Sequence, residues 1–174
     1  HELTDLIEGL HQAGSFKEAA QRLTQWAKTL TGCEAAMLRL RGETEGTPWL
    51  TVCALDGPSV SFLRDETMVG ESDCICGRVA SGAVDPSLPF YTEGGSFRWG
   101  RMDSLYEDFT PQQLGPLRGR CLQEGYVSLA VFPLRAGGSL VGSLHLADSQ
   151  PDRFAADTDL VESACRLAGD ILLR

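Results

Sequence analysis

The segment that decides the fold runs from Tyr126 to Ala147 and reads YVSLAVFPLRAGGSLVGSLHLA. Its first part, Tyr126 to Leu134, is almost continuously apolar, which is typical of a strand covered on both faces. The sequence Ala-Gly-Gly-Ser at 136–139 favours a turn, and Leu140 to Ala147 then alternates between two faces. We therefore expect a hairpin whose first strand lies in the interior of a sheet.

A second strand pair is expected earlier in the chain. Ala36 to Arg41 alternates between apolar and polar faces, as a half-buried strand does. Trp49 to Leu55 follows after a turn that contains Gly and Pro. These two segments predict another hairpin.

Helical periodicity marks both ends of the chain. Apolar residues recur at helical spacing over 3–10, 16–30 and 160–172. Ser15 and Glu18 form a capping-box sequence at the start of the second helix, and Gly32 is suited to end it. Asp157 is expected to cap the C-terminal helix.

The long middle segment, 56–125, has weak periodicity and many Gly and Pro residues. We expect a short helix at 76–80, a short strand at 96–100 and a helical turn at 111–117. Aromatic residues are spread through the segment, which favours a folded lid over disorder. The order of elements predicts an α+β domain, with terminal helices on one face of an antiparallel sheet and the lid on the other.

Composition limits the classes of function. A net charge of −9 disfavours binding to a phosphate backbone, so Arg118 and Arg120 are interpreted as a solvated loop. No apolar run approaches the ~20 residues that a membrane span needs, and the N-terminus lacks a secretory signal. We expect a cytoplasmic domain with reduced thiols. Three cysteines among apolar residues are expected to be buried small side chains, namely Cys33, Cys53 and Cys165.

Cys74, Cys76 and Cys121 form the sharpest chemical feature, because all three fall in the lid. Thiolates bind zinc, iron–sulfur clusters and haem iron, so these residues are candidate ligands for a metal or haem. A fourth ligand is then His145, Asp73 or an exogenous group. The alternatives are a redox-switch disulfide and simple packing. Arg78, two residues after Cys76, and Arg120, next to Cys121, are expected to favour the thiolate by lowering thiol pKa values.

Four further residues are candidate ligand contacts, each with a structural alternative. His145 lies in a strand and is either a ligand or a satisfied structural histidine. Tyr91 and Trp99 either line a pocket or pack the lid against the sheet. Arg98 selects a carboxylate or phosphate if it is buried in a pocket, and does nothing specific if it is exposed.

The order of elements, together with several motifs, resembles the GAF family, in particular GAF domains of bacterial and archaeal sensor histidine kinases and related regulators. The matching segments are Cys74–Val79, Asp85–Phe97, Arg120–Cys121, Glu124–Tyr126, Pro133–Leu134 with Gly142 and Leu144, and Asp152–Phe154. The resemblance covers nearly the whole chain. Two motifs of other GAF branches are missing from the sequence: the Asn-Lys-x-Phe-Asp-Glu pattern of cyclic-nucleotide binders and the Cys-His dipeptide that anchors bilin.

The resemblance implies a six-stranded antiparallel sheet, a small-molecule pocket under the lid, and terminal helices that pair in a homodimer and lead to a linked output domain. Residues 1–174 are interpreted as one GAF sensory domain of a larger protein, which binds a ligand and does not catalyse a reaction. Some relatives carry haem, which favours that cofactor by analogy. The alternative is a thiol-redox enzyme like the free methionine sulfoxide reductases, which share the fold and use loop cysteines. Leu167 and Leu172 are the expected dimer contacts.

Overall fold

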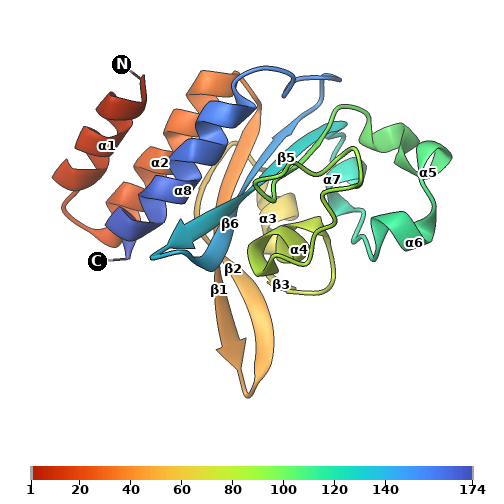
Figure 1. Cartoon of the computed structure of the whole chain (residues 1–174), viewed down its shortest axis with the longest axis horizontal. Helices are drawn as coiled ribbons and strands as arrows, with labels where there is room; N and C mark the ends of the chain where they lie inside the picture. Colours follow the sequence, from red (N-terminus) through yellow and green to blue (C-terminus); the bar gives the residue numbers. More distant parts are fainter. Residues whose placement is uncertain (1, 174) are drawn as a thin grey trace.

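One antiparallel sheet forms the centre of the protein in this computed structural model, which describes residues 2–173 (Figure 1). His1 and Arg174, the ends of the expected domain, lie outside the described residues. The strands follow the order β3-β2-β1-β6-β5-β4 across the sheet. Their bounds are β1 Ala35–Thr44, β2 Thr47–Asp56, β3 Met68–Gly70, β4 Phe97–Trp99, β5 Ser128–Ala136 and β6 Ser139–Asp148. Both expected hairpins are confirmed, and β5 lies inside the sheet between β4 and β6.

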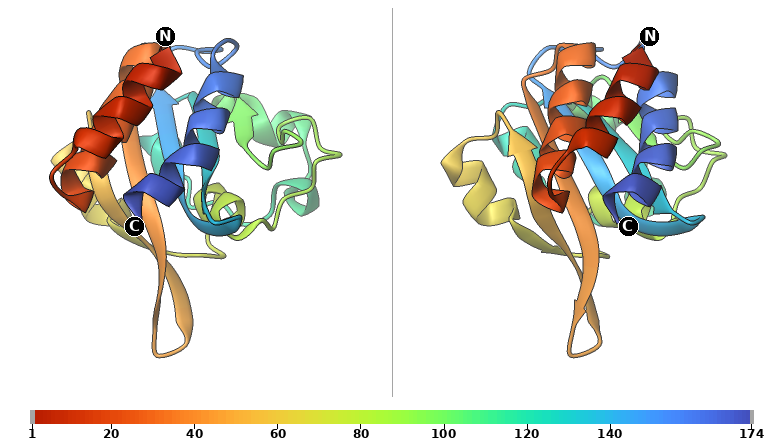
Figure 2. Two further views of the ribbon diagram at one scale, coloured as in Figure 1. Left: turned by 60° about the vertical axis from the view of Figure 1, so that its left-hand side comes forward. Right: turned by 90° about the vertical axis from the view of Figure 1, so that its left-hand side faces the viewer.

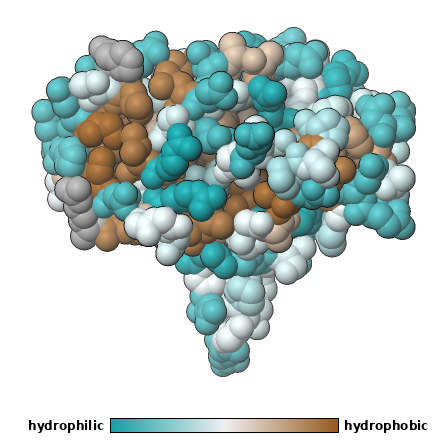
Figure 3. Space-filling model, in the orientation of Figure 1, coloured by the Kyte–Doolittle hydropathy of each residue, from teal (hydrophilic) through white to brown (hydrophobic). Residues whose placement is uncertain are grey.

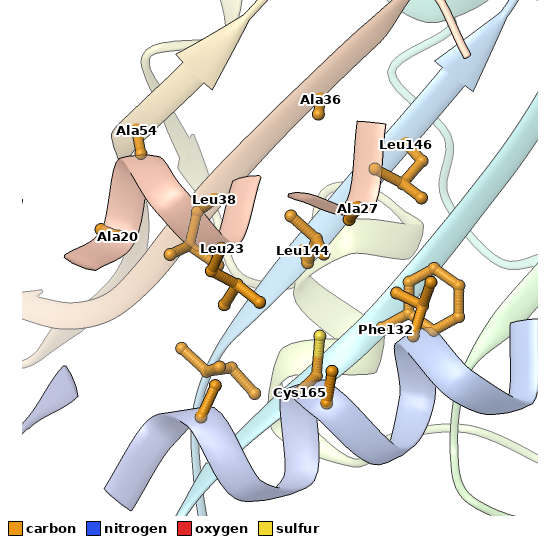
Figure 4. Packing of buried hydrophobic residues seen from close by; sticks show 14 of the residues in the cluster. Ala20, Leu23, Ala27, Ala36, Leu38, Ala54, Phe132, Leu144, Leu146 and Cys165 are labelled. Atoms are coloured by element: carbon orange, nitrogen blue, oxygen red, sulfur yellow. The ribbon is translucent and has the colours of Figure 1, made fainter. Parts of the chain in front are cut away.

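Three terminal helices cover one face of the sheet (Figure 2). They are α1 (Glu2–Gln12), α2 (Phe16–Thr31) and α8 (Thr158–Leu172). Their apolar stripes meet the inward side chains of the central strands, and Figure 4 shows Leu23 and Cys165 facing Leu38, Leu144 and Phe132. All five of these side chains are at most 1% exposed, so they lie at the centre of the core on this face of the sheet.

The helix ends agree with the sequence in part. The Ser15 hydroxyl accepts from the backbone N–H of Glu18, and Gly32 ends α2 in the left-handed region at φ 71°. The full capping box was wrong, because the Glu18 carboxylate accepts from Gly14 and not from Ser15. Asp157 occupies the expected N-cap position of α8, but it does not cap the helix through its side chain. Asp157 precedes α8 with φ 63°, and its side chain makes no capping hydrogen bond.

The lid covers the opposite face of the sheet (Figure 1). Its helices are α3 Val60–Glu66, α4 Ile75–Ser81, η1 Met102–Ser104, α5 Leu105–Asp108, α6 Pro111–Leu114 and α7 Arg120–Gln123. The expected short helix, short strand and helical turn correspond to α4, β4 and α6. The elements α3, α5, α7, η1 and β3 were not predicted, because elements of three to seven residues show at best a weak period. The lid and sheet enclose a second core.

Two surface features stand out in Figure 3. The β1–β2 hairpin extends away from the body, and its polar tip turns through Glu45 and Gly46. Apolar side chains gather over the end where the terminal helices lie. Leu167 on α8 is 47% exposed, whereas Leu172 is 5% exposed and belongs to the core, so Leu172 is wrong as a dimer contact. No helix within residues 2–173 is long and apolar enough to span a membrane.

Candidate functional site

A small cavity lies between the lid and the sheet. Its volume is about 60 Å³, well below the roughly 300–1,000 Å³ of sites for drug-sized ligands. Helices α4, α5 and α7, the segment 117–119 before α7, and strands β5 and β6 contribute most of its wall. The lining comprises Glu66, Cys74, Ile75, Cys76, Met102, Leu105, Tyr106, residues 117–122, Leu129, Val131 and His145. The site therefore brings together four of the predicted residues: all three lid cysteines and His145.

The pairing of two central strands places a buried arginine beside His145. Met37 on β1 is the register partner of His145 on β6, and Arg39 is the partner of Ser143. Arg39 and His145 are thus diagonal neighbours on the lid face of the sheet, a separation that a long side chain can bridge. The Arg39 guanidinium donates to Nδ1 of His145 over 3.0 Å, and both side chains are 1% exposed.

These contacts assign the tautomer of His145. A guanidinium only donates hydrogen bonds, so Nδ1 of His145 accepts and Nε2 carries the proton. Nε2 faces the Cys121 sulfur at 3.6 Å. On the other side of the ring, the Cys76 sulfur lies 3.3 Å from Nδ1 and 3.5 Å from the Arg39 donor. One imidazole ring therefore contacts both thiols.

Burial determines the charge of the cluster. It raises the pKa of Cys76 to about 12, although the Arg39 cation opposes the shift, and it raises the pKa of Cys121 well above its usual value. Burial and the charge of Arg39 together lower the pKa of His145 to about 3. Near neutral pH the cluster therefore consists of two thiols, a neutral imidazole and the buried Arg39 cation.

Arg78 and Arg120 do not have the predicted effect on the thiols. The Arg78 guanidinium donates to the carbonyls of Leu114 and Pro116, each over 2.7 Å. Arg120 pairs with Asp65 and Glu124 and lies over the ring of Phe62. The expected lowering of the pKa values of Cys76 and Cys121 is wrong, because burial dominates and the nearby cation is Arg39.

Arg118 lies exposed in a loop, as expected, whereas Arg120 is half-buried at the start of α7, and both arginines form ion pairs that the sequence did not predict. Nε of Arg118 donates to the Glu66 carboxylate over 2.9 Å, and Glu66 is only 4% exposed. This pair ties the segment before α7 to the end of α3, and the Arg120–Asp65 pair does the same. Two ion pairs therefore hold the rim of the cavity.

The fold of this chain matches solved structures at low sequence identity. The GAF domain of a phosphoenolpyruvate-protein phosphotransferase from Acinetobacter aligns over 98% of this chain and 90% of its own, with 11% identity and a TM-score of 0.70. A free methionine-R-sulfoxide reductase from Neisseria meningitidis aligns over 98% and 85%, with 12% identity and a TM-score of 0.70. A domain named for a two-component sensor histidine kinase of Sinorhizobium meliloti aligns over 90% of both chains, with 21% identity and a TM-score of 0.58.

The chain has the GAF fold. No family model and no curated protein matches the sequence. At 11–21% identity, these solved structures show the fold of this chain and leave its ligand open.

The predicted metal ligands do not form a ready-made site with three or more protein ligands. Among the residues that the structure describes, no group of three or more His, Cys, Asp or Glu side chains is arranged to hold a metal ion. All six cysteines are free thiols. Asp73 accepts from the backbone N–H of Gly70 and is not part of the cavity wall. A haem does not fit the present 60 Å³, since drug-sized ligands occupy about 300–1,000 Å³.

The other three candidate residues lie elsewhere in the GAF fold. Tyr91 is 9% exposed and packs edge-on against Phe90 and Phe97. Trp99 packs against Phe90 and Phe109, which is lid packing. Arg98 is exposed and donates to the Thr158 hydroxyl over 3.1 Å. Arg98 and Trp99 border a separate hollow of about 260 Å³, together with Pro89, Asp152 and Phe154.

Sequence reasoning missed Arg39, Glu66 and Met102 as parts of the site. Arg39 had a visible signal, since it is a charged residue inside the apolar run Ala35–Leu40. Such a residue on a central strand needs a buried polar partner. Glu66 and Met102 gave no comparable signal, because they lie in the lid, whose path cannot be read from periodicity.

Proposed function

We propose that this chain is the sensory domain of a signalling protein, a sensor histidine kinase or a transcriptional regulator, and that it binds a small ligand in the cavity beside His145. The observation that carries the proposal is the cavity itself, with apolar walls and one buried polar cluster. Pockets of this composition orient a ligand with few polar groups and bury the rest of it. The GAF fold, which a histidine kinase domain shares, is consistent with this role.

A side-chain contact links the lid to the C-terminal helix. Glu162 on α8 accepts from the hydroxyls of Thr92 and Ser96, over 2.7 and 2.5 Å. A Cβ at Gly94 would collide with the Glu162 carboxylate, so a larger residue there would displace that carboxylate from its present position. We call Thr92, Ser96 and Glu162 the Glu162 clamp. It joins the two faces of the sheet around the β4 edge, and Arg98 with Thr158 adds a second link.

The cavity is connected to this clamp through packed rings. Leu105 on α5 lines the cavity, and Phe109 follows at the end of that helix. The Phe109 ring lies 4.9 Å from the ring of Phe90, centroid to centroid, and Phe90 is two residues before Thr92. A ligand that moves α5 would therefore press on the clamp. Coupling of this kind requires that the ligand favour one of two lid positions.

The output of the domain is proposed to pass through the terminal helices. α8 carries Glu162 on the side of the clamp, and Leu167 is exposed on the same helix. We propose that α1 and α8 form a homodimer and lead to a covalently linked output domain. A shift of α8 at the clamp then changes the relation between the two copies.

A permanent occupant of the cavity tests this proposal without knowledge of the ligand. In Cys121→Met the side chain gains two heavy atoms, which fit 60 Å³. Amide hydrogen exchange is then compared along α8 and residues 92–96. A coupling of about 1 kcal/mol changes exchange about five-fold. Cys53→Met is the matched control, because Cys53 packs on the helix face of the sheet.

Two results are informative. Altered exchange in α8 that disappears when Glu162→Gln is added supports the cavity-to-helix route. Exchange in α8 that is the same in Cys121→Met, Cys53→Met and the wild type overturns it. If Cys121→Met does not fold by circular dichroism, Cys121→Val gives the same comparison with a smaller occupant.

A further inference from the structure

Soft donor atoms are concentrated around the cavity. Its wall includes four sulfur-bearing residues and one imidazole, namely Cys74, Cys76, Met102, Cys121 and His145. The remaining lining is mainly aliphatic. Thiolates, thioethers and imidazoles are the donors that select soft transition-metal ions over Mg²⁺ or Ca²⁺. Two of the sulfurs, those of Cys76 and Cys121, contact the same imidazole ring, at Nδ1 and Nε2 respectively.

The electrostatics of the cavity narrow the choice of ion. Arg39 is a cation that is 1% exposed, and its recorded partners are an imidazole nitrogen, two sulfur atoms and one carbonyl. Its Nε has no hydrogen-bond partner among the described residues. The nearby Glu66 carboxylate is already paired with Arg118. A buried cation of this kind favours the entry of a species with one net negative charge.

We propose that the cavity binds one Cu(I) ion through the thiolates of Cys76 and Cys121, with the Arg39 guanidinium balancing the charge of the bis-thiolate complex. This inference rests on the proposed function, since it names the ligand of the sensory cavity. A single ion suits 60 Å³ better than an organic molecule of ordinary size. Two thiolates suffice for Cu(I), so the ion does not require a preformed group of three ligands.

The charges balance for a monovalent ion. Each of the two thiols gives a proton to solvent, two Cu–S bonds form, and copper stays in the Cu(I) state throughout. The site goes from one positive charge, that of Arg39, to a net charge of zero. Zn²⁺ bound to the same two thiolates would leave one buried positive charge, and it prefers four ligands. The site is therefore expected to prefer Cu(I) to Zn²⁺ because of the charge of the ion as well as its affinity for soft ligands.

Metal binding would also change the conformation of the lid, and a sensor requires two conformations that differ in ligand affinity. In the structure the two sulfurs contact Nδ1 and Nε2 of His145. Cu(I) would take both sulfurs as ligands and free the imidazole edge. Cys76 lies on α4 and Cys121 on α7, so the ion would join two lid helices.

The test is an anaerobic titration of residues 1–174 with Cu(I), in competition with the coloured chelator bicinchoninate. The reduced wild type is expected to withdraw one equivalent of Cu(I), and Cys76→Ser and Cys121→Ser are each expected to lose that equivalent. Cys53→Ser, on the opposite face, is expected to retain it. Thermal melts establish that each variant is folded, and copper-edge X-ray absorption of the wild type is expected to report two sulfur ligands.

Arg39→Met separates the charge effect from structure. The variant is expected to bind Cu(I) at least ten-fold more weakly than the wild type. The ratio of its affinities for Cu(I) and Zn²⁺ is expected to be smaller than that of the wild type. If Arg39→Met does not fold, Arg39→Lys is measured instead. Arg39→Lys keeps the positive charge and is expected to keep the preference for Cu(I) over Zn²⁺. The proposal is overturned if the wild type withdraws no more Cu(I) than Cys76→Ser and Cys121→Ser, or if it prefers Zn²⁺. In that case an exchange effect in Cys121→Met would still support a sensory cavity for another ligand.

Discussion

His145 should make the stability of the metal-free protein depend on pH in a specific way. The folded imidazole has a pKa of about 3, against an ordinary value of 6.5, because burial and the Arg39 charge disfavour its protonated form. Between pH 6.5 and pH 3 the imidazole of His145 is therefore protonated in the unfolded chain and neutral in the folded chain. This stabilising contribution is complete above pH 6.5 and is lost as the pH falls from 6.5 towards 3.

The magnitude follows from the size of the pH interval. One pH unit corresponds to about 1.36 kcal/mol, so the 1.5 units from 6.5 to pH 5 remove about 2 kcal/mol of unfolding free energy. The groups near the ring all leave the pKa of His145 lowered. The Arg39 cation repels an imidazolium, and Cys76 and Cys121 are neutral thiols. The Glu66 carboxylate is paired with Arg118. No compensating anion among the described residues contacts the ring.

The assay is urea unfolding at pH 7, 6 and 5, followed by circular dichroism on reduced, chelator-treated protein. We compare the wild type with His145→Gln, whose amide can accept from Arg39 and does not titrate. His11→Gln, at an exposed position on α1, is the control. Between pH 7 and 5 the wild type should lose about 2 kcal/mol more than His145→Gln. Parallel curves for these two proteins would refute the reasoning.

Three other outcomes are expected. Gly77→Ala should lower the unfolding free energy by about 1–3 kcal/mol, because its Cβ would collide with the Glu71 carbonyl, whereas Gly42→Ala, with open space around it, should change it by less than about 0.5 kcal/mol in the same urea assay. Leu167→Glu should convert a dimer to a monomer in analytical ultracentrifugation with unchanged circular dichroism; a persistent dimer would place the interface elsewhere. Incubation with free methionine sulfoxide and dithiothreitol should give no methionine, because burial raises the pKa values of Cys76 and Cys121; steady turnover would instead establish the thiol enzyme.

The strands and terminal helices could be predicted because their sequences carry a period. The alternation of Leu140–Ala147 identifies β6 and places His145 on the face opposite Leu144. The lid could be predicted only as a folded segment with a few short elements. Its helices are stabilised by tertiary contacts such as Arg118–Glu66 and Arg78–Leu114, which leave no repeating pattern in the sequence.

The residues of the candidate site could also be predicted only in part. The sequence identified Cys74, Cys76, Cys121 and His145 by their chemical type, and all four line one cavity. It also selected Tyr91, Arg98 and Trp99, which lie outside that cavity, because an aromatic or basic side chain in a loop carries no directional information.

The sequence by itself determined the α+β architecture, the two hairpins and the apolar faces of α1, α2 and α8, because hydrophobic periodicity acts over a few neighbouring residues. Only the tertiary structure decided the protonation state of the cluster. Arg39 and His145 are 106 residues apart in the chain, and strand register brings them within 3.0 Å. Burial then keeps the imidazole neutral and the thiols protonated, because removal from water disfavours every charge that lacks a partner.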